Sequence, residues 1–129
     1  MEKEFVPYTL ALRLKALGFD EPCLGYYAGD ILCTGQPQEI HLDEDGNYKK
    51  SKTESFPITV APTFSQAFRW FREKYDLHHV IHNFTFKKGT DEEYLAEVGK
   101  ADDTFSECRT YEEAELDCLK KLIEIVKNK

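Results

Sequence analysis

Basic side chains are scarce in this sequence relative to acidic ones. The chain has 17 Lys and Arg residues against 24 Asp and Glu residues, which gives a formal net charge of −7 at pH 7. General binding to nucleic acid needs clustered Lys and Arg that displace counterions from phosphates. We therefore expect no such binding. The acidic excess lies mainly in segments 43–45, 91–93 and 112–117, so a local basic surface could still receive a small anion.

Long apolar runs are also absent. No segment approaches the roughly 18 to 20 consecutive apolar residues that cross a bilayer as a helix. The opening Met1-Glu2-Lys3-Glu4 differs from the start of a signal peptide. We expect a cytoplasmic protein without membrane segments. Its four cysteines, which form no CxxC pair, are expected to be free thiols rather than zinc ligands or disulfides: Cys23, Cys33, Cys108 and Cys118.

Several motifs of catalysis and cofactor binding are missing. The glycines form no phosphate-binding loop, and no signature of a nucleophilic serine or cysteine occurs. In a strand, His78 and His82 would lie roughly 13 Å apart and His79 would point to the other face, so the three cannot chelate one metal ion. Asp43, Asp45 and Asn47 resemble part of a calcium loop, but Lys52 stands six residues after Gly46, where such a loop needs Glu, so we expect no calcium site. We assign no catalytic residue, metal or cofactor, and favour a protein that is not an enzyme.

Core-forming residues are plentiful. Hydrophobic residues make up 41% and aromatic residues 13% of the 129 residues. A chain of this length and composition is able to bury one compact core. We expect a single domain over residues 1–129.

The first half of the chain predicts one helix and several short strands. The helix is expected at 7–17, with Gly18 at its end and Phe19 making the hydrophobic contact of the cap. Around the short connection Ala28-Gly29-Asp30 we expect a hairpin in which Leu24 and Tyr26 share one face and Tyr27 lies on the other. The expected strands are 23–27, 31–34 and 57–61, and segment 35–55 predicts either a second hairpin or a loop.

The second half predicts two helices on either side of a pair of strands. Thr63 and Gln66 have the spacing of a capping box at the start of a helix, and Trp70 is expected at the flank of its apolar stripe. The stripe consists of Phe64, Ala67, Phe68, Phe71 and Tyr75. Strands are expected at 79–86 and 94–98, followed by an irregular segment and a last helix at 111–126. The element order is α-β-β-(β)-α-β-β-α, which predicts an α+β fold with helices packed on an antiparallel sheet.

The last helix carries an apolar arc that is wider than contact with one sheet requires. Thr110 and Glu113 predict a capping box at its start. The arc comprises two adjacent stripes: Tyr111, Ala114, Cys118, Leu122 and Ile125, beside Leu119, Ile123 and Val126. Either the helix is sandwiched between the sheet and another element, or it supplies part of a homodimer contact.

Recognition of a ligand is the chemistry that these residues favour. Tyr and Trp side chains stack on planar groups, and Arg and Lys side chains bind phosphates. The candidate ligand-binding residues are Tyr26, Tyr27, Arg69, Trp70, Arg72, His82, Lys87 and Lys88. The same residues have a competing interpretation. In it, the aromatic side chains pack in the core and the cations are solvated at the surface.

Three stretches carry a resemblance to a known family: 5–27, 61–75 with its run Ala-Phe-Arg-Trp-Phe-Arg-Glu-Lys-Tyr, and 110–126 with Thr-Tyr-Glu-Glu-Ala-Glu and Cys-Leu-Lys-Lys-Leu-Ile-Glu-Ile-Val. They resemble a family of short proteins of unknown function from phages, prophages and gut-type bacteria. The resemblance covers about half of the chain. It implies no catalytic or binding residue.

A small acidic protein of phage type is often an accessory factor that blocks a host process. The resemblance thus favours an oligomeric protein that sequesters a nucleotide-like signal of host defence without cleaving it. The alternative is an acidic inhibitor that binds a host defence protein or nuclease, with Asp43, Glu44 and Asp45 as the acidic surface. A bacterial housekeeping protein is a third hypothesis, and an enzyme that degrades a signal is a fourth.

Overall fold

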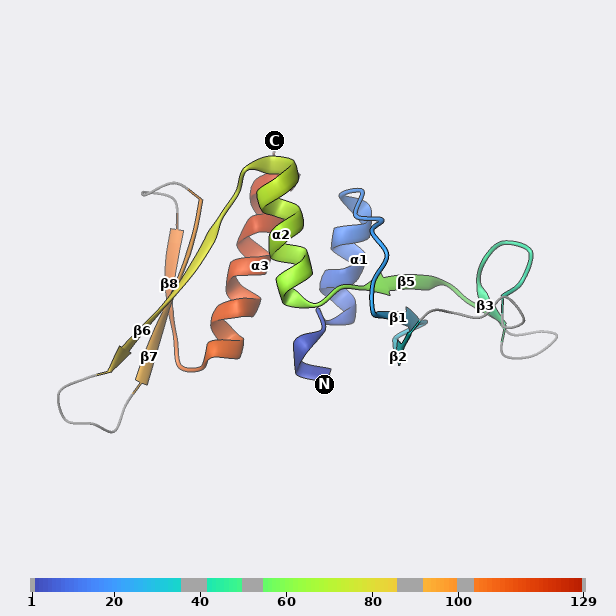
Figure 1. Cartoon of the computed structure of the whole chain (residues 1–129), viewed down its shortest axis with the longest axis horizontal. Coiled ribbons are helices and arrows are strands. Elements are labelled where there is room, and N and C mark those ends of the chain that lie inside the picture. The colour runs from blue at the N-terminus through green and yellow to red at the C-terminus, as the bar shows by residue number, and fades with distance from the viewer. Residues whose placement is uncertain (1, 36–41, 50–54, 86–91, 100–103, 129) are drawn as a thin grey trace. The chain divides into compact units, whose positions relative to one another are not determined.

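The structure is a computed structural model of the chain, and it describes residues 2–35, 42–49, 55–85, 92–99 and 104–128. The chain divides into two compact units, Met1–Thr63 and Phe64–Lys129, and each is described by itself. Helices and antiparallel sheets occur in both units, which confirms the predicted α+β class (Figure 1). The prediction of a single domain stays a prediction. Within the described ranges, no helix is both long and apolar enough to cross a membrane.

The first helix of the first unit ends as the sequence predicts. A short 3-10 helix at Glu2–Glu4 precedes helix α1, Tyr8–Ala16. Gly18 adopts a φ of +98°, which is accessible to glycine without strain. Its N–H donates to the Lys15 carbonyl and the N–H of Phe19 donates to the Leu14 carbonyl, both at 3.0 Å. This pair of bonds is the Schellman motif, and it turns the chain back so that Phe19 is buried.

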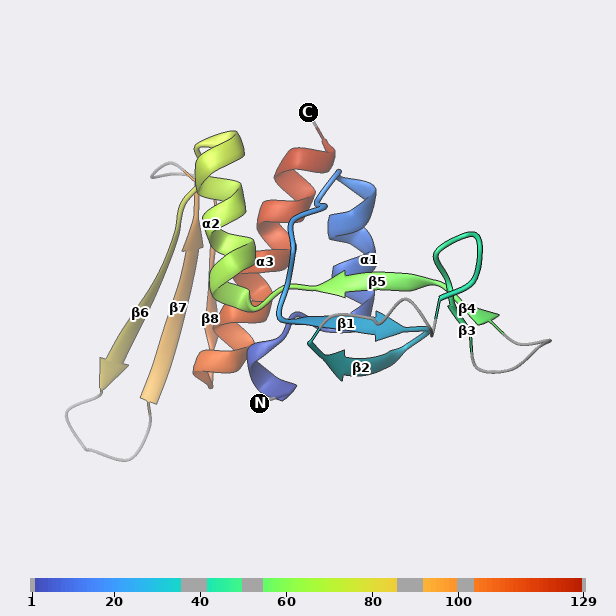
Figure 2. The same ribbon diagram turned by 45° about the vertical axis from the view of Figure 1, so that its right-hand side comes forward.

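The first unit contains a three-stranded antiparallel sheet in the order β2-β1-β5 (Figure 2). Its strands are β1 Gly25–Ala28, β2 Ile31–Thr34 and β5 Ile58–Ala61. The two-residue turn between β1 and β2 begins at Gly29, whose φ is +62°. Turns of this length with a positive φ match the twist of paired strands, so the predicted hairpin is confirmed.

Helix α1 covers one face of this sheet. The ring of Tyr8 lies 5.3 Å from that of Tyr27, whose hydroxyl donates to the Val6 carbonyl at 2.7 Å. Beside Tyr27, the side chain of Thr59 is almost completely buried. Leu24 lies outside the strand and is 72% exposed. Tyr26, one residue before Tyr27, points to the opposite face, as predicted from the alternation of side chains along a strand.

Segment 35–55 contains part of a second hairpin, which was one of the two alternatives. Strand β3, Tyr48–Lys49, pairs with β4, Ser55–Phe56. A compact acidic turn precedes β3: Asp43 N–H donates to the Asn47 carbonyl at 2.9 Å, and Gly46 N–H donates to the Asp43 carbonyl at 3.1 Å.

The second unit has the element order α2-β6-β7-β8-α3. Helices α2, Phe64–Tyr75, and α3, Tyr111–Lys127, flank the strands β6 His79–Thr85, β7 Glu92–Val98 and β8 Thr104–Cys108. The strands form an antiparallel sheet in the order β6-β7-β8. Strand β8 falls in the segment that was expected to be irregular. Its five residues show little periodicity of their own, and they form a strand because they pair with the open edge of β7.

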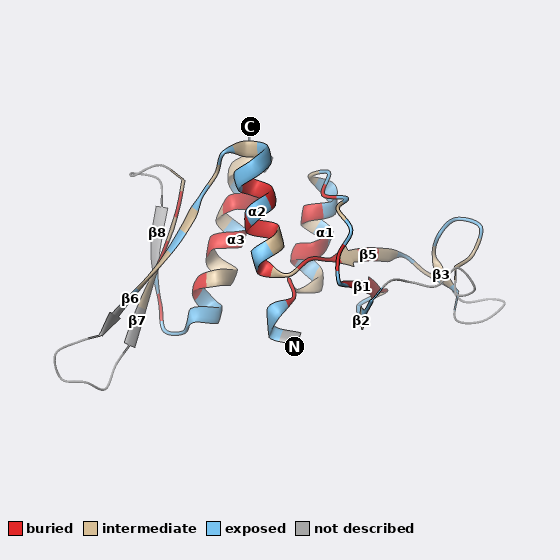
Figure 3. Ribbon diagram, viewed as in Figure 1, coloured by how far each residue is buried: buried red, intermediate tan, exposed pale blue. Residues whose placement is uncertain are grey.

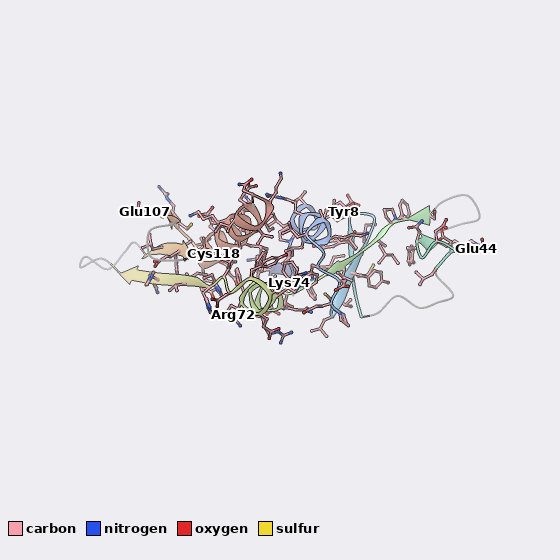
Figure 4. The ribbon with its side chains drawn as sticks, turned by 90° about the horizontal axis from the view of Figure 1, so that it is seen from above. Tyr8, Glu44, Arg72, Lys74, Glu107 and Cys118 are labelled. Carbon is pink, nitrogen blue, oxygen red and sulfur yellow. The ribbon has the colours of Figure 1, made fainter. Side chains whose placement is uncertain are left out.

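Both helices pack on the same face of the β6-β7-β8 sheet. The ring of His79 in β6 stacks on that of Phe68 in α2, with 3.6 Å between the centroids. The thiol of Cys118 in α3 contacts the Glu97 carbonyl of β7 at 4.0 Å, and Figure 4 shows Cys118 on the side of α3 nearest the sheet. Ala96 and Val98, which point to the same side as His79, are buried.

Helix α3 is sandwiched, which explains its wide apolar arc. It contacts all three strands of the sheet and also helix α2. Buried residues recur in successive turns of the helix, as the separate red segments of α3 in Figure 3 show: Ala114, Cys118, Leu119, Leu122 and Ile123. These contacts agree with the first of the two alternatives for the buried part of the arc, whereas Tyr111 is 47% exposed and Ile125 and Val126 are partly exposed. The N-cap is confirmed as well, because Thr110 Oγ1 accepts a hydrogen bond from Glu113 N–H at 3.1 Å.

Trp70 does not lie at the boundary with solvent, so that prediction was wrong. Its side chain is 5% exposed. The indole packs edge-on against Phe71 and Tyr75, with centroid distances of 5.0 and 5.4 Å, and the Lys74 ammonium lies 5.1 Å from its centroid. A large aromatic ring beside an apolar stripe widens the buried arc when neighbouring rings pack around it.

Candidate functional site

The face of the β6-β7-β8 sheet that points away from both helices is the most informative surface of the second unit. We call it the outer sheet face. Its described side chains come from alternate positions of the three strands: Val80, His82, Leu95, Glu97 and Glu107. The helices cover the opposite face, so these side chains remain accessible.

The strand register sets these residues in two rows. His82 pairs with Leu95, which in turn pairs with Glu107, so one row crosses all three strands. Val80 pairs with Glu97 in the next row. Directly paired residues of neighbouring strands have Cβ atoms about 5 Å apart. The two carboxylates thus flank the aliphatic side chain of Leu95.

The outer sheet face is both apolar and acidic. Val80 is 46% exposed, and Leu95 is partly exposed. His82 Nε2 lies 3.1 Å from Glu97 Oε2, and the two side chains are 42% and 32% exposed. Glu107, labelled in Figure 4, is exposed at β8. Among its described positions the face carries two carboxylates and no Lys or Arg, so its charge is negative.

His79 lies on the inner face of the same strand. Burial is the main reason that its pKa is lowered from 6.5 to about 4, and the nearby Arg72 guanidinium and the His78 imidazole lower it further. The ring is therefore neutral at pH 7 and belongs to the packing between β6 and α2. This position agrees with the prediction that His79 and His82 point to opposite faces.

The acidic turn of the first unit is a second accessible feature. Asp43 Oδ1 accepts hydrogen bonds from Asn47 N–H at 2.8 Å and Asp45 N–H at 2.9 Å, and the bond from Asn47 is the main reason that its pKa is lowered. Glu44, labelled in Figure 4, and Asp45 are exposed. Asp43 therefore shapes the turn, whereas Glu44 and Asp45 present its charge.

The two tyrosines proposed for ligand binding have different surroundings. Tyr27 is 6% exposed and is held by its ring contact with Tyr8 and its bond to the Val6 carbonyl. Tyr26 is partly exposed on the opposite face of its sheet. Its pKa is raised, chiefly by burial and then by the thiol of Cys33. Only Tyr26 of this pair offers an accessible ring.

The basic candidates do not gather on one described surface. Arg69 and Arg72 are exposed on α2, which packs on the inner face of its sheet, whereas His82 points to the outer face. Lys87 and Lys88 lie outside the described residues. Trp70, between the two arginines in sequence, is buried as described above.

The described residues include no group of three or more His, Cys, Asp or Glu side chains placed to hold a metal ion. None of the four cysteines forms a disulfide bond. Burial raises the pKa of the Cys118 thiol to about 12, so this thiol is protonated and unreactive at neutral pH.

Comparisons with protein-family models, with curated proteins and with solved structures found no match to this chain. The resemblance to short phage and bacterial proteins stays a prediction.

Sequence reasoning missed the outer sheet face, although a signal for it exists. Along β7, Leu95 and Glu97 alternate with Tyr94, Ala96 and Val98. Such alternation separates an inner from an outer set of side chains. The alternation does not show that both helices pack on the same face of the sheet. The outer side chains are accessible because both helices do so.

Proposed function

We propose that this protein is a non-enzymatic binding protein that docks on a second protein through the outer sheet face, and that the partner presents basic side chains. The observation that carries the proposal is the packing of both α2 and α3 on one face of the sheet. On the opposite face, the partly exposed Leu95 lies between two carboxylates, Glu97 and Glu107, and the exposed Val80 pairs with Glu97.

The chemistry of this face fits a protein partner. Aliphatic contacts from Val80 and Leu95 contribute affinity through burial of apolar surface. The surrounding carboxylates select for cations and disfavour acidic partners, because like charges brought together at an interface are repelled. The net charge of −7 attracts a basic partner over a longer range at low salt. This is the class of acidic inhibitor described above, with its contact surface placed on the second unit.

Sequestration of a nucleotide-like signal receives less support from the geometry. That hypothesis needs aromatic ring faces open to a planar ligand and cations beside them. Tyr27 and Trp70 are buried, and the arginines of α2 lie on the other side of the sheet from His82.

The test compares two variants that each remove two negative charges. One is Glu97→Gln with Glu107→Gln on the outer sheet face, and its matched control is Glu44→Gln with Asp45→Asn on the acidic turn. Partners are recovered on the immobilised chain from its native cells, identified by mass spectrometry, purified and titrated by calorimetry. We expect the outer-face variant to weaken binding about tenfold or more, equivalent to about 1.4 kcal/mol, and the turn variant to bind within about twofold of the natural chain.

The natural chain should also bind more weakly as salt rises, because exposed charges are screened. The opposite ranking of the two variants would move the site to the acidic turn. Equal binding by all three chains would refute a role for both surfaces. Native mass spectrometry on the same preparation decides the other hypothesis: a discrete mass excess that leaves as a small molecule on denaturation would support sequestration instead.

A further inference from the structure

The outer sheet face carries a histidine in contact with one of its carboxylates. His82 Nε2 lies 3.1 Å from Glu97 Oε2, and the two side chains are 42% and 32% exposed. The contact joins strands β6 and β7 diagonally, because Val80, two positions before His82, is the residue that pairs with Glu97. Side chains in such diagonal positions are within reach of each other. A titratable ring therefore lies beside one of the carboxylates to which the proposed function assigns the binding of a basic partner.

The charge of this imidazole decides what Glu97 offers to a partner. Histidine is the residue type whose ordinary titration falls between pH 5 and 8. A neutral ring leaves the negative charge of the carboxylate uncompensated, whereas a protonated ring forms an ion pair with it. Two carboxylates and a neutral imidazole give the described side chains of the face a charge of −2, and protonation of His82 reduces it to −1.

The other described groups around His82 have no titration in the range of histidine. Val80 is its neighbour in the same strand and Leu95 is the residue opposite, and both are aliphatic. Glu107 of β8 is the second carboxylate of the face, one strand beyond Leu95. Carboxylates ordinarily titrate near pH 4, well below histidine. Helices α2 and α3 pack on the opposite face of the sheet, so the charge of the outer face between pH 5.5 and 7.5 depends on His82.

Two neighbouring histidines differ from His82 in their surroundings. His79 points to the inner face, where burial, the Arg72 guanidinium and the His78 imidazole lower its pKa to about 4, so it stays neutral at pH 5.5. His78 lies just before β6, and its Nε2 is 3.2 Å from Oδ1 of Asp76 in the connection between α2 and β6. His78 is therefore a matched control: it also contacts a carboxylate, but not one of those on the outer sheet face.

We propose that the outer sheet face releases its basic partner as the pH falls, and that protonation of His82 causes the release. This inference rests on the proposed function, because it requires the partner's cation to lie near Glu97. Repulsion between the imidazolium and a cation about 6 Å away weakens binding about threefold in bulk water, and more where the contact excludes water. Because binding and protonation are linked, a bound basic partner in turn opposes protonation of the ring.

The test uses a probe of known chemistry, acetylated hexa-arginine amide, titrated into the isotope-labelled full chain at pH 7.5 and pH 5.5. Amide signals of Leu95, Glu97 and Glu107 in the magnetic resonance spectrum report binding to the outer sheet face. Those of Glu44 and Asp45 report binding to the acidic turn at residues 43–47, which contain no histidine. We expect the dissociation constant at the outer face to rise about threefold or more at pH 5.5. The constant at the turn should change by less than about 1.5-fold, because its carboxylates stay ionised.

Two variants assign the effect to one ring. His82→Gln removes the proton site and keeps a polar side chain at a position that is 42% exposed. Its outer-face dissociation constant should be independent of pH and within about twofold of the natural chain's value at pH 7.5. His78→Gln should keep the pH dependence of the natural chain. Circular dichroism at both pH values verifies folding, and if His82→Gln fails to fold, the comparison of the outer face with the turn in the natural chain decides in its place.

The outcomes separate this inference from the proposed function. Probe binding of equal strength at both pH values would overturn the pH-dependent release and leave the outer sheet face as a binding surface. A pH dependence that persists in His82→Gln would overturn the role of His82. Outer-face signals that do not move with the probe at pH 7.5 would overturn both the release and the proposed binding surface.

Discussion

His79 makes the stability of the second unit depend on pH. Its ring stacks on Phe68 with 3.6 Å between centroids and 16° between planes, and burial with the nearby Arg72 lowers its pKa to about 4. In the unfolded chain the imidazole titrates near its ordinary value of 6.5. Between these two values the unfolded chain binds the proton and the folded chain does not, so falling pH favours unfolding. The stabilisation is complete above about pH 7 and declines as the pH falls from 6.5 toward 4.

The difference between the two pKa values limits the decrease in the free energy of unfolding at low pH to about 3 kcal/mol. At pH 5 the limit is about 2 kcal/mol, and we reduce it to about 1 kcal/mol because the ring is partly exposed to solvent. Other groups that titrate in this range act on stability as well. The prediction therefore concerns the difference between the natural chain and a variant that lacks only this proton site.

The variant is His79→Phe, which keeps an aromatic ring against Phe68 but cannot bind a proton. Free energies of unfolding are measured by urea titration at pH 7, 6 and 5. We expect the natural chain to lose about 1 kcal/mol more than His79→Phe between pH 7 and pH 5. His78→Gln serves as the control: His78 is exposed beside Asp76 and is the smallest of the three causes that lower the pKa of His79, so this variant should stay close to the natural chain. Parallel pH profiles for the natural chain and His79→Phe would refute the reasoning.

Three further predictions concern single contacts. Thr110→Ala removes the bond to Glu113 N–H at the start of α3 and should lower the free energy of unfolding by about 1 kcal/mol, whereas Thr110→Ser should restore most of it. Gly25→Ala places a Cβ 2.9 Å from the buried ring of Phe5 and 3.0 Å from a backbone carbonyl, and should destabilise the chain by about 1–3 kcal/mol in the same assay. Cys118 should resist iodoacetamide at pH 8 in the folded chain while Cys33 is modified, as peptide mass spectrometry would show; equal rates for the two would contradict the burial of Cys118.

Local signals in the sequence predicted the helices and most of the strands. Gly18 with Phe19 determines the end of α1, Gly29 determines the hairpin turn, and Thr110 caps α3. Each of these signals acts over a few residues, so a pattern along the chain is sufficient to find it. Strand β8 was missed because it forms by pairing with β7. Its own five residues give no local signal of that pairing.

The surfaces were harder to predict than the elements. Trp70 appeared to flank the apolar stripe of its helix, but the neighbouring rings of Phe71 and Tyr75 enclose it. The open sheet face depends on which side each helix packs, and hydrophobic alternation is the same for either side. Sequence reasoning therefore favoured aromatic and basic residues as the site, whereas the structure leaves the outer sheet face accessible.

Site-specific photocrosslinking tests the proposed binding surface most directly. A benzophenone amino acid at position 80 replaces the 46% exposed Val80 on the outer sheet face, and the same group at position 12 replaces the 40% exposed Leu12 on α1. Irradiation in the native cells should link position 80, and not position 12, to a protein whose crosslinked peptide is rich in Lys and Arg. The link should disappear when Glu97→Gln and Glu107→Gln are added. Identical products from both positions, or no protein adduct at position 80, would contradict the assignment of the outer sheet face as the binding surface.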